Sequence, residues 1–436
     1  DGIYYWTLDG EFIIVDGQKI KAQGTDGKDG ADGSDGEDGT DGTDGVTPKL
    51  EIRDGYWWIS YDNGRNWMQL GKATGEDGAD GKDGDSIKIT QDENNVYFEL
   101  ADGTIITISK TGQLTSNIIE FKDPYVKTIC VAAWDTDGDS ELSYAEATAV
   151  TTLGSKFKGN ALIKNFDELQ YFTHLTAIEE SAFEKCTSLM SIIIPAGVET
   201  IGKLAFANCS SLYIVDFAKA SILKTISGGW NSNTPSYYGA FYNCTGLESI
   251  KLPASVEVIE ASAFQDCTAL KNVSFVDGSR LKIIGGRYSG SRNYAGAFAN
   301  CSSLTTIEIP ANVEIIEAAA FMYCTALTSV EFQQGSKLTE IGGGHFNMTC
   351  YGAFAQCNNL TTFDAFSCTQ LEKIGDGAFF NDTKLEIFKI GTQTPPTKAD
   401  HVFGYNEYSI PKDAILKVPS GCADIYKNWG FKNIVS

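Results

Sequence analysis

A run of acidic residues after position 134 carries the clearest chemical signal in the chain. Oxygen-bearing side chains occupy the first, third, fifth, seventh, ninth and twelfth positions of one short loop. These residues are Asp135, Asp137, Asp139, Glu141, Ser143 and Glu146. A hard cation such as Ca²⁺ accepts six to eight oxygen ligands, and this spacing brings them around one tight turn. The loop therefore predicts a structural Ca²⁺ site.

This spacing is that of an EF-hand loop, with one departure. The sixth position, where Gly usually makes the sharp turn, is Ser140, and Gly138 stands two residues earlier. Leu142 at the eighth position is apolar, as is usual, and is expected to face inward. The alternative is a solvated acidic turn that binds no ion. A bound ion would stiffen the joint between the segments on either side.

Helical segments are expected to position this loop. Asp123 followed by Pro124 is a helix start, because Asp caps the helix and Pro is tolerated in the first turn. Apolar residues follow at helical spacing as far as Trp134, and a second helical stretch continues to Val150. We expect an EF-hand-like helix–loop–helix that also caps the first end of the repeats described below.

Catalytic chemistry has little support in the residues. The three histidines, His174, His345 and His401, lie far apart in the sequence, and the zinc-protease, nucleophile-elbow and P-loop motifs are absent. No pair of carboxylates is singled out for glycosidase chemistry. We therefore expect a protein that is not an enzyme.

The segment from about 166 to 390 repeats one phrase eight times: Ala-Phe, then Cys three residues after the Phe, then Leu. The repeated residues are Phe183, Phe206, Phe241, Phe264, Phe298, Phe321, Phe354 and Phe379. A short β-branched run such as 191–194 follows each phrase, and Asp382 replaces the last Cys. A fixed period of this length predicts a solenoid, in which each coil covers the next and the ends need caps.

The cysteines fit the core of such a solenoid. Seven of the eleven stand at the repeat position, where we expect buried free thiols. A disulfide framework is the alternative, but it is typical of small secreted domains that lack a core. Cys350, Cys368 and Cys422 lie off the repeat, and their state is left open.

Alternate coils carry inserts that predict a binding surface. The spacing between successive Phe residues runs 23, 35, 23, 34, 23, 33 and 25. The inserts at 228–239, 285–296 and 342–352 must therefore project from one side, and such insertions often form the binding face. They carry residue types enriched at recognition surfaces: Trp230, Tyr237, Tyr238, Arg287, Tyr288, Arg292, Tyr294, His345, Phe346 and Tyr351. The alternative is that these loops only pack on one another.

The first 110 residues have a different character. Alternating runs at 3–20, 49–70 and 86–109 turn at Asp-Gly or Asn-Gly and predict three antiparallel β units. Between them, 24–47 and 75–85 carry Gly at nearly every third position beside Asp, which suits an acidic linker, a short triple helix or calcium capture. Trp57, Trp58 and Trp67 form either the core of a small sheet or a carbohydrate platform.

Composition limits the partners. The net charge is -23, and residues 1–110 hold 24 acidic against 10 basic residues, which argues against nucleic acid. No apolar run approaches the ~20 residues of a membrane span. The chain begins at Asp1 without Met, so an export signal, and a lipid anchor as one option, are expected on a segment before it. We expect a monomer.

The phrase Ile-x-x-x-Ala-Phe-x-x-Cys-x-x-Leu, at 259–270 and 316–327, resembles the BspA-like, or Treponema pallidum-type, leucine-rich repeat. The resemblance implies an α/β repeat solenoid, a right-handed superhelix with a sheet on its concave side. The small antiparallel β units and the helix–loop–helix precede it. We divide the chain into β units with linkers (1–110), the helix–loop–helix (111–155), repeats (156–393) and a C-terminal cap (394–436).

The resemblance also implies a function and a location. Proteins of this family are secreted or surface-anchored binding proteins, often lipoproteins, whose partners are host proteins, bacterial surfaces or glycans. The segments at 4–10 and 54–57 are similar to an accessory domain of Bacteroides surface proteins and polysaccharide lyases. The expected function is recognition or adhesion through the repeat face and aromatic inserts. The alternative is a glycan-binding or glycan-processing accessory role of the N-terminal aromatic β units.

Overall fold

A computed structural model of the protein describes residues 118–231, 236–289, 293–346, 349–399, 401–405 and 410–436, together with ten short strands before residue 110. The chain forms two units, Asp1–Ile118 and Ile119–Ser436. The predicted linkers at 24–47 and 75–85 lie outside the described residues.

The first unit contains short antiparallel strands. One three-stranded sheet has the order β5-β6-β7 and another has the order β10-β9-β8, while β1 pairs with β2 and β3 with β4. The strands are β1 (Thr7–Leu8), β2 (Glu11–Phe12), β3 (Ile14–Val15), β4 (Gln18–Lys19), β5 (Lys49–Arg53), β6 (Tyr56–Ser60), β7 (Met68–Lys72), β8 (Lys88–Gln91), β9 (Asn95–Glu99) and β10 (Ile105–Ser109). Trp57 and Trp58 lie on β6, and Trp67 lies outside the described residues.

Two α-helices begin the second unit, and their starts follow from their caps. The carboxylate of Asp123 accepts the N–H groups of Tyr125 and Val126 at the start of α1 (Pro124–Trp134). Ser143 and Glu146 form a capping box at the start of α2 (Tyr144–Ala149). Each cap satisfies backbone donors that have no partner within the helix.

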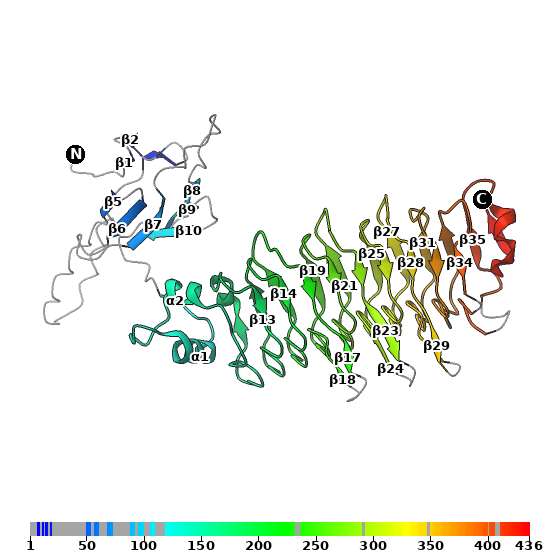
Figure 1. Cartoon of the computed structure of the whole chain (residues 1–436), viewed down its shortest axis with the longest axis horizontal. Coiled ribbons are helices and arrows are strands. Elements are labelled where there is room, and N and C mark those ends of the chain that lie inside the picture. Colours follow the sequence, from blue (N-terminus) through cyan, green and yellow to red (C-terminus); the bar gives the residue numbers. More distant parts are fainter. Residues whose placement is uncertain are drawn as a thin grey trace, which may run out of the picture. The chain divides into compact units, whose positions relative to one another are not determined.

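The repeats build a solenoid of stacked coils (Figure 1). One side is a nine-stranded parallel sheet of two-residue strands, which we call the short-strand sheet. Its strands are β12 (Ala177–Ile178), β14 (Thr200–Ile201), β16 (Thr225–Ile226), β20 (Val258–Ile259), β22 (Ile283–Ile284), β26 (Ile315–Ile316), β28 (Glu340–Ile341), β32 (Lys373–Ile374) and β34 (Thr397–Lys398).

A second side of each coil, which we call the long-strand face, carries mostly four-residue strands that pair in parallel within three groups. The groups are β11 (Asn165–Phe166), β13 (Ser191–Ile194) and β15 (Ile214–Phe217); β19 (Ser249–Leu252) and β21 (Asn272–Phe275); and β25 (Thr306–Ile309), β27 (Ser329–Phe332), β31 (Thr362–Ala365), β33 (Ile387–Ile390), β35 (Ile415–Lys417) and β36 (Asn433–Val435). Side chains alternate along these strands, so that every second residue enters the core.

The repeated Phe and Cys residues form the core. From Phe183 to Phe379 the rings stack with centroids 5.0–5.5 Å apart and nearly parallel planes. Each of the seven Cys thiols donates a hydrogen bond to the carbonyl of the Phe one coil earlier, as Cys244 does to Phe206 at 3.0 Å. All eleven cysteines are buried free thiols, which confirms the prediction and settles Cys350, Cys368 and Cys422.

The α/β class predicted for the repeats is wrong in its helical part. Among the described coils the connections are turns and short strands, so the fold is a β-solenoid. The residue before each repeated Cys adopts a left-handed conformation, as Lys185 does with a φ of 63°, and Asn208 with 61°. A left-handed residue cannot continue a right-handed helix, so the Phe–Cys segment closes as a turn.

The solenoid also extends beyond the eight copies seen in the sequence. Phe157 stacks on Phe183 at 5.1 Å, and Phe403 stacks on Phe379 at 5.8 Å. Each adds a coil within which the repeat phrase is missing. Near the two ends of the solenoid, η1 (Asp167–Tyr171) and η2 (Ala423–Trp429) are 3-10 helices.

Candidate functional site

The acidic loop between α1 and α2 brings together three of its six predicted ligands. Ligand atoms of Asp135, Asp137 and Asp139 lie within 4.8 Å of one another. The two carboxylate oxygens of Asp135 accept the N–H groups of Gly138 at 2.6 Å and Ser140 at 3.0 Å. Ser140 has a φ of 67°, so this loop makes its sharp turn without Gly at that position. Carboxylate oxygens are the ligands that a hard cation prefers.

The other predicted ligands have different partners. Glu141 forms an ion pair with Lys127 at 2.5 Å. One oxygen of Glu146 accepts the N–H of Thr136 at 2.6 Å, and the other accepts the N–H and hydroxyl of Ser143 at 2.9 Å. Desolvation acts to raise the pKa of Glu146, but the hydrogen bonds from Ser143 and Thr136 prevail and lower it to about 2. These residues therefore hold the helix ends.

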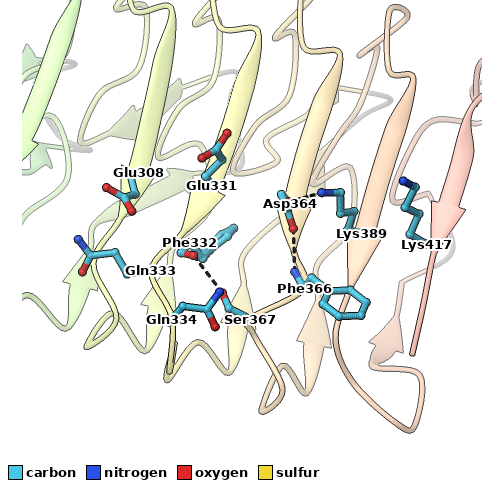
Figure 2. Close-up of a pocket in the computed structure, with 10 residues that line it drawn as sticks. All are labelled: Glu308, Glu331, Phe332, Gln333, Gln334, Asp364, Phe366, Ser367, Lys389 and Lys417. Atoms are coloured by element: carbon cyan, nitrogen blue, oxygen red, sulfur yellow. Dashed lines mark hydrogen bonds and ion pairs between the residues drawn. The ribbon is translucent and has the colours of Figure 1, made fainter. Parts of the chain in front are cut away.

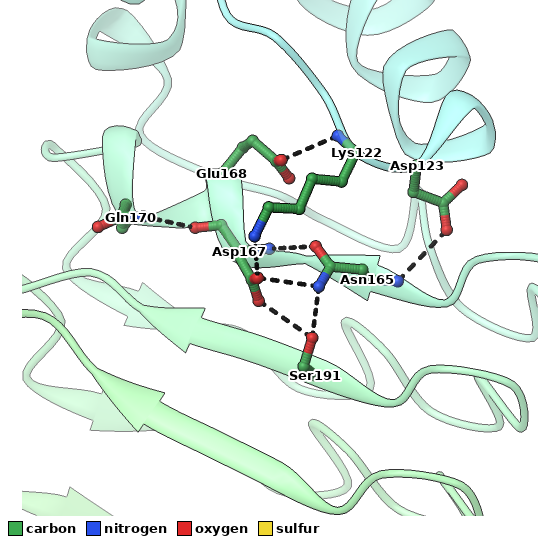
Figure 3. A network of polar contacts seen from close by, with 7 residues as sticks. All are labelled: Lys122, Asp123, Asn165, Asp167, Glu168, Gln170 and Ser191. Carbon is green, nitrogen blue, oxygen red and sulfur yellow. Dashed lines mark hydrogen bonds and ion pairs between the residues drawn. The ribbon is translucent and has the colours of Figure 1, made fainter. Parts of the chain in front are cut away.

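A polar network joins α1 to the first coils (Figure 3). The second oxygen of Asp123 accepts the N–H groups of Lys164 and Asn165, so one carboxylate holds four backbone donors. Lys122 pairs with Asp167 at 2.9 Å, and Asp167 accepts the hydroxyl of Ser191 on the next coil at 3.1 Å. These hydrogen bonds tie the start of α1 to the first two coils, which indicates a structural role for the cluster.

The three inserts form β-hairpins along one edge of the solenoid (Figure 1). Their strands are β17 (Trp230–Asn231) with β18 (Ser236–Tyr237), β23 (Gly286–Ser289) with β24 (Asn293–Gly296), and β29 (His345–Phe346) with β30 (Thr349–Cys350). Each insert closes with a Gly against the next coil: a Cβ on Gly239 would lie 1.8 Å from the carbonyl oxygen of Ser262. Only Gly permits so close an approach, which fixes the base of the hairpin.

The predicted contact residues of these inserts do not all face solvent. Arg287 is exposed, and Tyr237, Tyr238 and Tyr294 are half-buried. Tyr351 is wrong as a contact residue: only 1% of it is exposed, because it lies in a small apolar cluster with Ala319, Met322 and Ala355. The remaining predicted residues, whose side chains lie outside the described part, are Trp230, Tyr288, Arg292, His345 and Phe346.

The second and third inserts touch each other. The rings of Tyr294 and Tyr351 lie 6.4 Å apart, and Tyr294 also contacts Tyr323 at 5.7 Å. Burial raises the pKa of Tyr294 well above its usual value. Packing between inserts therefore accounts for some of the aromatic residues, as the alternative interpretation expected.

Charges beside the short-strand sheet largely neutralise one another from coil to coil. The ion pairs are Lys224–Glu199 at 2.7 Å, Lys282–Glu257 at 3.1 Å and Lys373–Glu340 at 2.6 Å. Such surface pairs contribute little stability.

The long-strand face holds a groove that is lined by unpaired charges (Figure 2). The groove has a volume of about 580 Å³. Strand register places five of its residues in one row across β25, β27, β31, β33 and β35: Glu308, Glu331, Asp364, Lys389 and Lys417. Asp364 and Lys389 form an ion pair. The side chains of the other three make no hydrogen bond or ion pair within the described part of the chain.

The exposed ring in this groove marks a change in the repeat. The long strands of every second coil, such as β19 and β25, end with an aliphatic residue that Pro follows, whereas β31 in the same series ends with Ala365 and is followed by Phe366. Of Phe366, 47% is exposed. Gly391 of the next coil lies so close that a Cβ there would be 1.8 Å from the carbonyl oxygen of Phe366. The ring is therefore held at the surface.

The groove was missed by sequence reasoning, although a signal for it existed. Each charged residue of the row is the third residue of its long strand. An alignment of the long strands of successive coils would therefore have placed these residues side by side. Variable turn lengths between coils hide that register in the sequence. At 365–366, Ala and Phe replace the aliphatic residue and Pro of the equivalent coils, which is likewise visible only against those coils.

The structure also brings His401 and Asp376 together, which the sequence did not suggest. Their nearest side-chain atoms lie 3.3 Å apart, and the His401 ring lies 4.9 Å from that of Tyr405. The thiol of Cys350 donates to the Tyr405 hydroxyl at 3.4 Å. Burial raises the pKa of Cys350, so this thiol is neutral and unsuited to nucleophilic attack at neutral pH.

No helix within the described residues is long and apolar enough to cross a bilayer.

Comparison with known proteins identifies the repeats. A family model described as a BspA type leucine rich repeat region matches in six copies, at residues 156–236, 234–351 and 291–394, which together exceed half of the chain. A second model, for a domain of unknown function, matches residues 31–113. No curated protein matches the chain.

Several solved structures are similar to parts of the chain. A Treponema pallidum leucine rich repeat protein is 23% identical over 48% of this chain and 72% of its own, with a TM-score of 0.29. A Bacteroides ovatus leucine-rich repeat protein is 20% identical over 60% and 76%, with a TM-score of 0.27. The pneumococcal vaccine antigen PcpA is 16% identical over 80% and 98%, with a TM-score of 0.27.

Proposed function

Because the chain belongs to the BspA-type leucine-rich repeat family, we propose that it is a non-enzymatic recognition or adhesion protein that binds a protein or glycan partner. The family resemblance favours a secreted or surface-held protein. The single observation that carries the proposal is the groove on the long-strand face. It combines unpaired charges with an exposed aromatic ring, and such groups are common at recognition surfaces.

The hairpin edge is a second contact region in this proposal. Arg287 is exposed there, and Tyr237, Tyr238 and Tyr294 are half-buried. Tyr and Arg are enriched among residues that dominate binding energy. The partner would be a host or bacterial surface protein, or a glycan.

Binding of the intact chain to a glycan array and to a panel of extracellular-matrix and bacterial surface proteins tests the proposal. We expect selective, saturable binding to a member of one panel. Absence of binding to both panels would contradict it, and turnover of a bound glycan would contradict the non-enzymatic role. Selective glycan binding that disappears in a chain lacking residues 1–110 would favour the N-terminal aromatic units instead.

We also propose that the acidic loop binds a structural Ca²⁺ through Asp135, Asp137 and Asp139. The close approach of their ligand atoms supports this, since like charges in one turn repel without a cation. Glu141, Ser143 and Glu146 are the further ligands that the loop pattern predicts. The ion would fix the turn between α1 and α2.

Removal of Ca²⁺ tests this site. We expect a chelator to lower the melting temperature and added Ca²⁺ to restore it. The double variant Asp137→Asn, Asp139→Asn should lose this response, whereas Glu314→Gln, an exposed carboxylate elsewhere, should keep it. An unchanged melting temperature with chelator, in a chain that copurifies with no metal, would refute the site.

A further inference from the structure

The charges in the groove of the long-strand face follow an order that specifies a ligand. The row begins with two unpaired carboxylates, continues with a paired carboxylate and lysine, and ends with an unpaired lysine. We propose that the groove binds an extended segment of a partner protein, with a basic residue at one end and an acidic group at the other. This inference rests on the proposed recognition function and gives its partner a chemistry.

The acidic end is built from Glu308 on β25 and Glu331 on β27. The two residues are direct partners in the parallel register, and both side chains are exposed. Neighbouring strands lie about 4.8 Å apart, so two like charges face each other without compensation. A guanidinium or ammonium group between them would relieve this repulsion and form charge-assisted hydrogen bonds.

The middle of the groove offers an apolar surface beside polar groups. The exposed ring of Phe366 lies there, with the Gln333 and Gln334 side chains on the neighbouring turn (Figure 2). The hydroxyl of Ser367 donates to the carbonyl of Phe332 at 3.0 Å, which ties the two turns together. An apolar side chain of the ligand can cover Phe366 while its backbone meets the amides.

The basic end is Lys417 on β35, which is half-buried at the end of the row. Lys389 beside it is already paired with Asp364. From the midpoint of the two carboxylates to Lys417 the row crosses three and a half strand spacings, or about 17 Å. An extended chain covers this distance in about five residues. The ligand should therefore carry its basic and acidic groups about five residues apart.

Other ligands fit this row less well. Within the described residues, three or more potential metal ligands gather only in the acidic loop, so the two carboxylates do not form a metal cluster. A neutral glycan would leave Glu308, Glu331 and Lys417 without counter-charges. A second copy of this chain is a poor source of basic segments, since Asp and Glu number 57 against 34 Lys and Arg.

Synthetic peptides test the inference with the intact chain. The probes are fluorescein-labelled, end-capped peptides with an Arg pair, a central Leu and one Asp, in which the separation of Arg and Asp varies. We expect fluorescence anisotropy to show the tightest binding at a separation of about five residues, weakening as salt is added. Peptides with the two charge types exchanged should bind at least about tenfold more weakly.

Variants then locate the site. Glu308→Gln with Glu331→Gln should weaken peptide binding about tenfold or more and leave the melting temperature unchanged or higher, because it removes a like-charge contact. Lys417→Gln should weaken only peptides that carry the Asp. Glu257→Gln, a charge change beside the short-strand sheet, is the matched control and should bind as the native chain does.

The results separate this inference from the recognition function. Equal binding of normal and charge-exchanged peptides, or unchanged binding by the double carboxylate variant, would overturn the inference. If the native chain and the Glu308→Gln, Glu331→Gln variant bind the same panel protein equally well, the groove inference is wrong but the recognition function is supported. A glycan partner that the same variant loses would overturn the assignment of a peptide ligand. Absence of any partner for the intact chain would remove both.

Discussion

Asp382 stands where the seven preceding coils carry Cys, and its burial leads to a pH-dependent stability. Only 2% of the residue is exposed. One carboxylate oxygen accepts the N–H of Cys357 at 2.9 Å, and the other is buried without a partner. Burial raises the pKa of Asp382 well above its usual range, more than the Cys357 hydrogen bond lowers it. The side chain is therefore a neutral acid in the folded chain.

The size and sign of the effect follow from proton linkage. An unfolded Asp releases its proton near pH 3.9, whereas the folded chain retains it, so the stability from this proton is full below about pH 4 and falls as pH rises. Each pH unit in that window costs about 1.36 kcal/mol. Between pH 5 and 7 the loss reaches at most about 2.7 kcal/mol, or several degrees in melting temperature.

Replacement of Asp382 by Asn removes this titration while keeping the acceptor for Cys357. We expect Asp382→Asn to melt higher than the native chain at pH 7, with a difference that shrinks toward pH 4.5. Calorimetric melting temperatures of both proteins across this range measure it, with the exposed Glu314→Gln as a control whose difference stays flat. A difference between Asp382→Asn and the native chain that does not change with pH would refute the neutral carboxyl.

Three further predictions concern the frame that holds the sites. Asp123→Ala should destabilise the second unit by about 3 kcal/mol in urea unfolding, because a helix cap and two further charged hydrogen bonds are lost, and Asp123→Asn by less. Gly239→Ala should lower the free energy of unfolding by about 3 kcal/mol, because its Cβ would meet the carbonyl oxygen of Ser262. Gly278→Ala, whose Cβ would point into open space, should lower it by about 1 kcal/mol. Equal losses in the two variants would contradict the close contact at Gly239. Burial raises the pKa of Cys244 to about 12, so a thiol reagent at pH 8 should label the seven repeat cysteines only after unfolding. Rapid labelling of these cysteines in the native chain would contradict their burial in the core.

The solenoid could be predicted from the sequence because the same side-chain types recur at fixed spacing in its core. Phe, Cys and Leu recur at one position in each coil, and burial requires those types there. The end coils escaped notice because Phe157 and Phe403 keep the stacked ring without the rest of the phrase. The α/β class of the coils was implied by the family resemblance. Residue types alone do not show the left-handed conformation before each Cys, such as that of Lys185, which replaces a helix with a turn.

The candidate sites were predicted less completely. In the acidic loop, spacing identified all the oxygen-bearing residues, but the hydrogen bonds that hold Glu146 at the helix start depend on the folded turn. Among the inserts, composition could not separate exposed Arg287 from buried Tyr351. The groove was missed because its row joins residues that are 23 to 33 positions apart, such as Glu308, Glu331 and Asp364.

Hydrogen–deuterium exchange of the intact chain, alone and with a partner found by the panels, tests the recognition surface most directly. Recognition through the groove predicts slower exchange on binding at the turns that carry Gln333, Gln334 and Phe366, and in strands β25, β27 and β31. The short-strand sheet should exchange as before. Protection confined to residues 1–118, with the groove unchanged, would contradict recognition by the long-strand face.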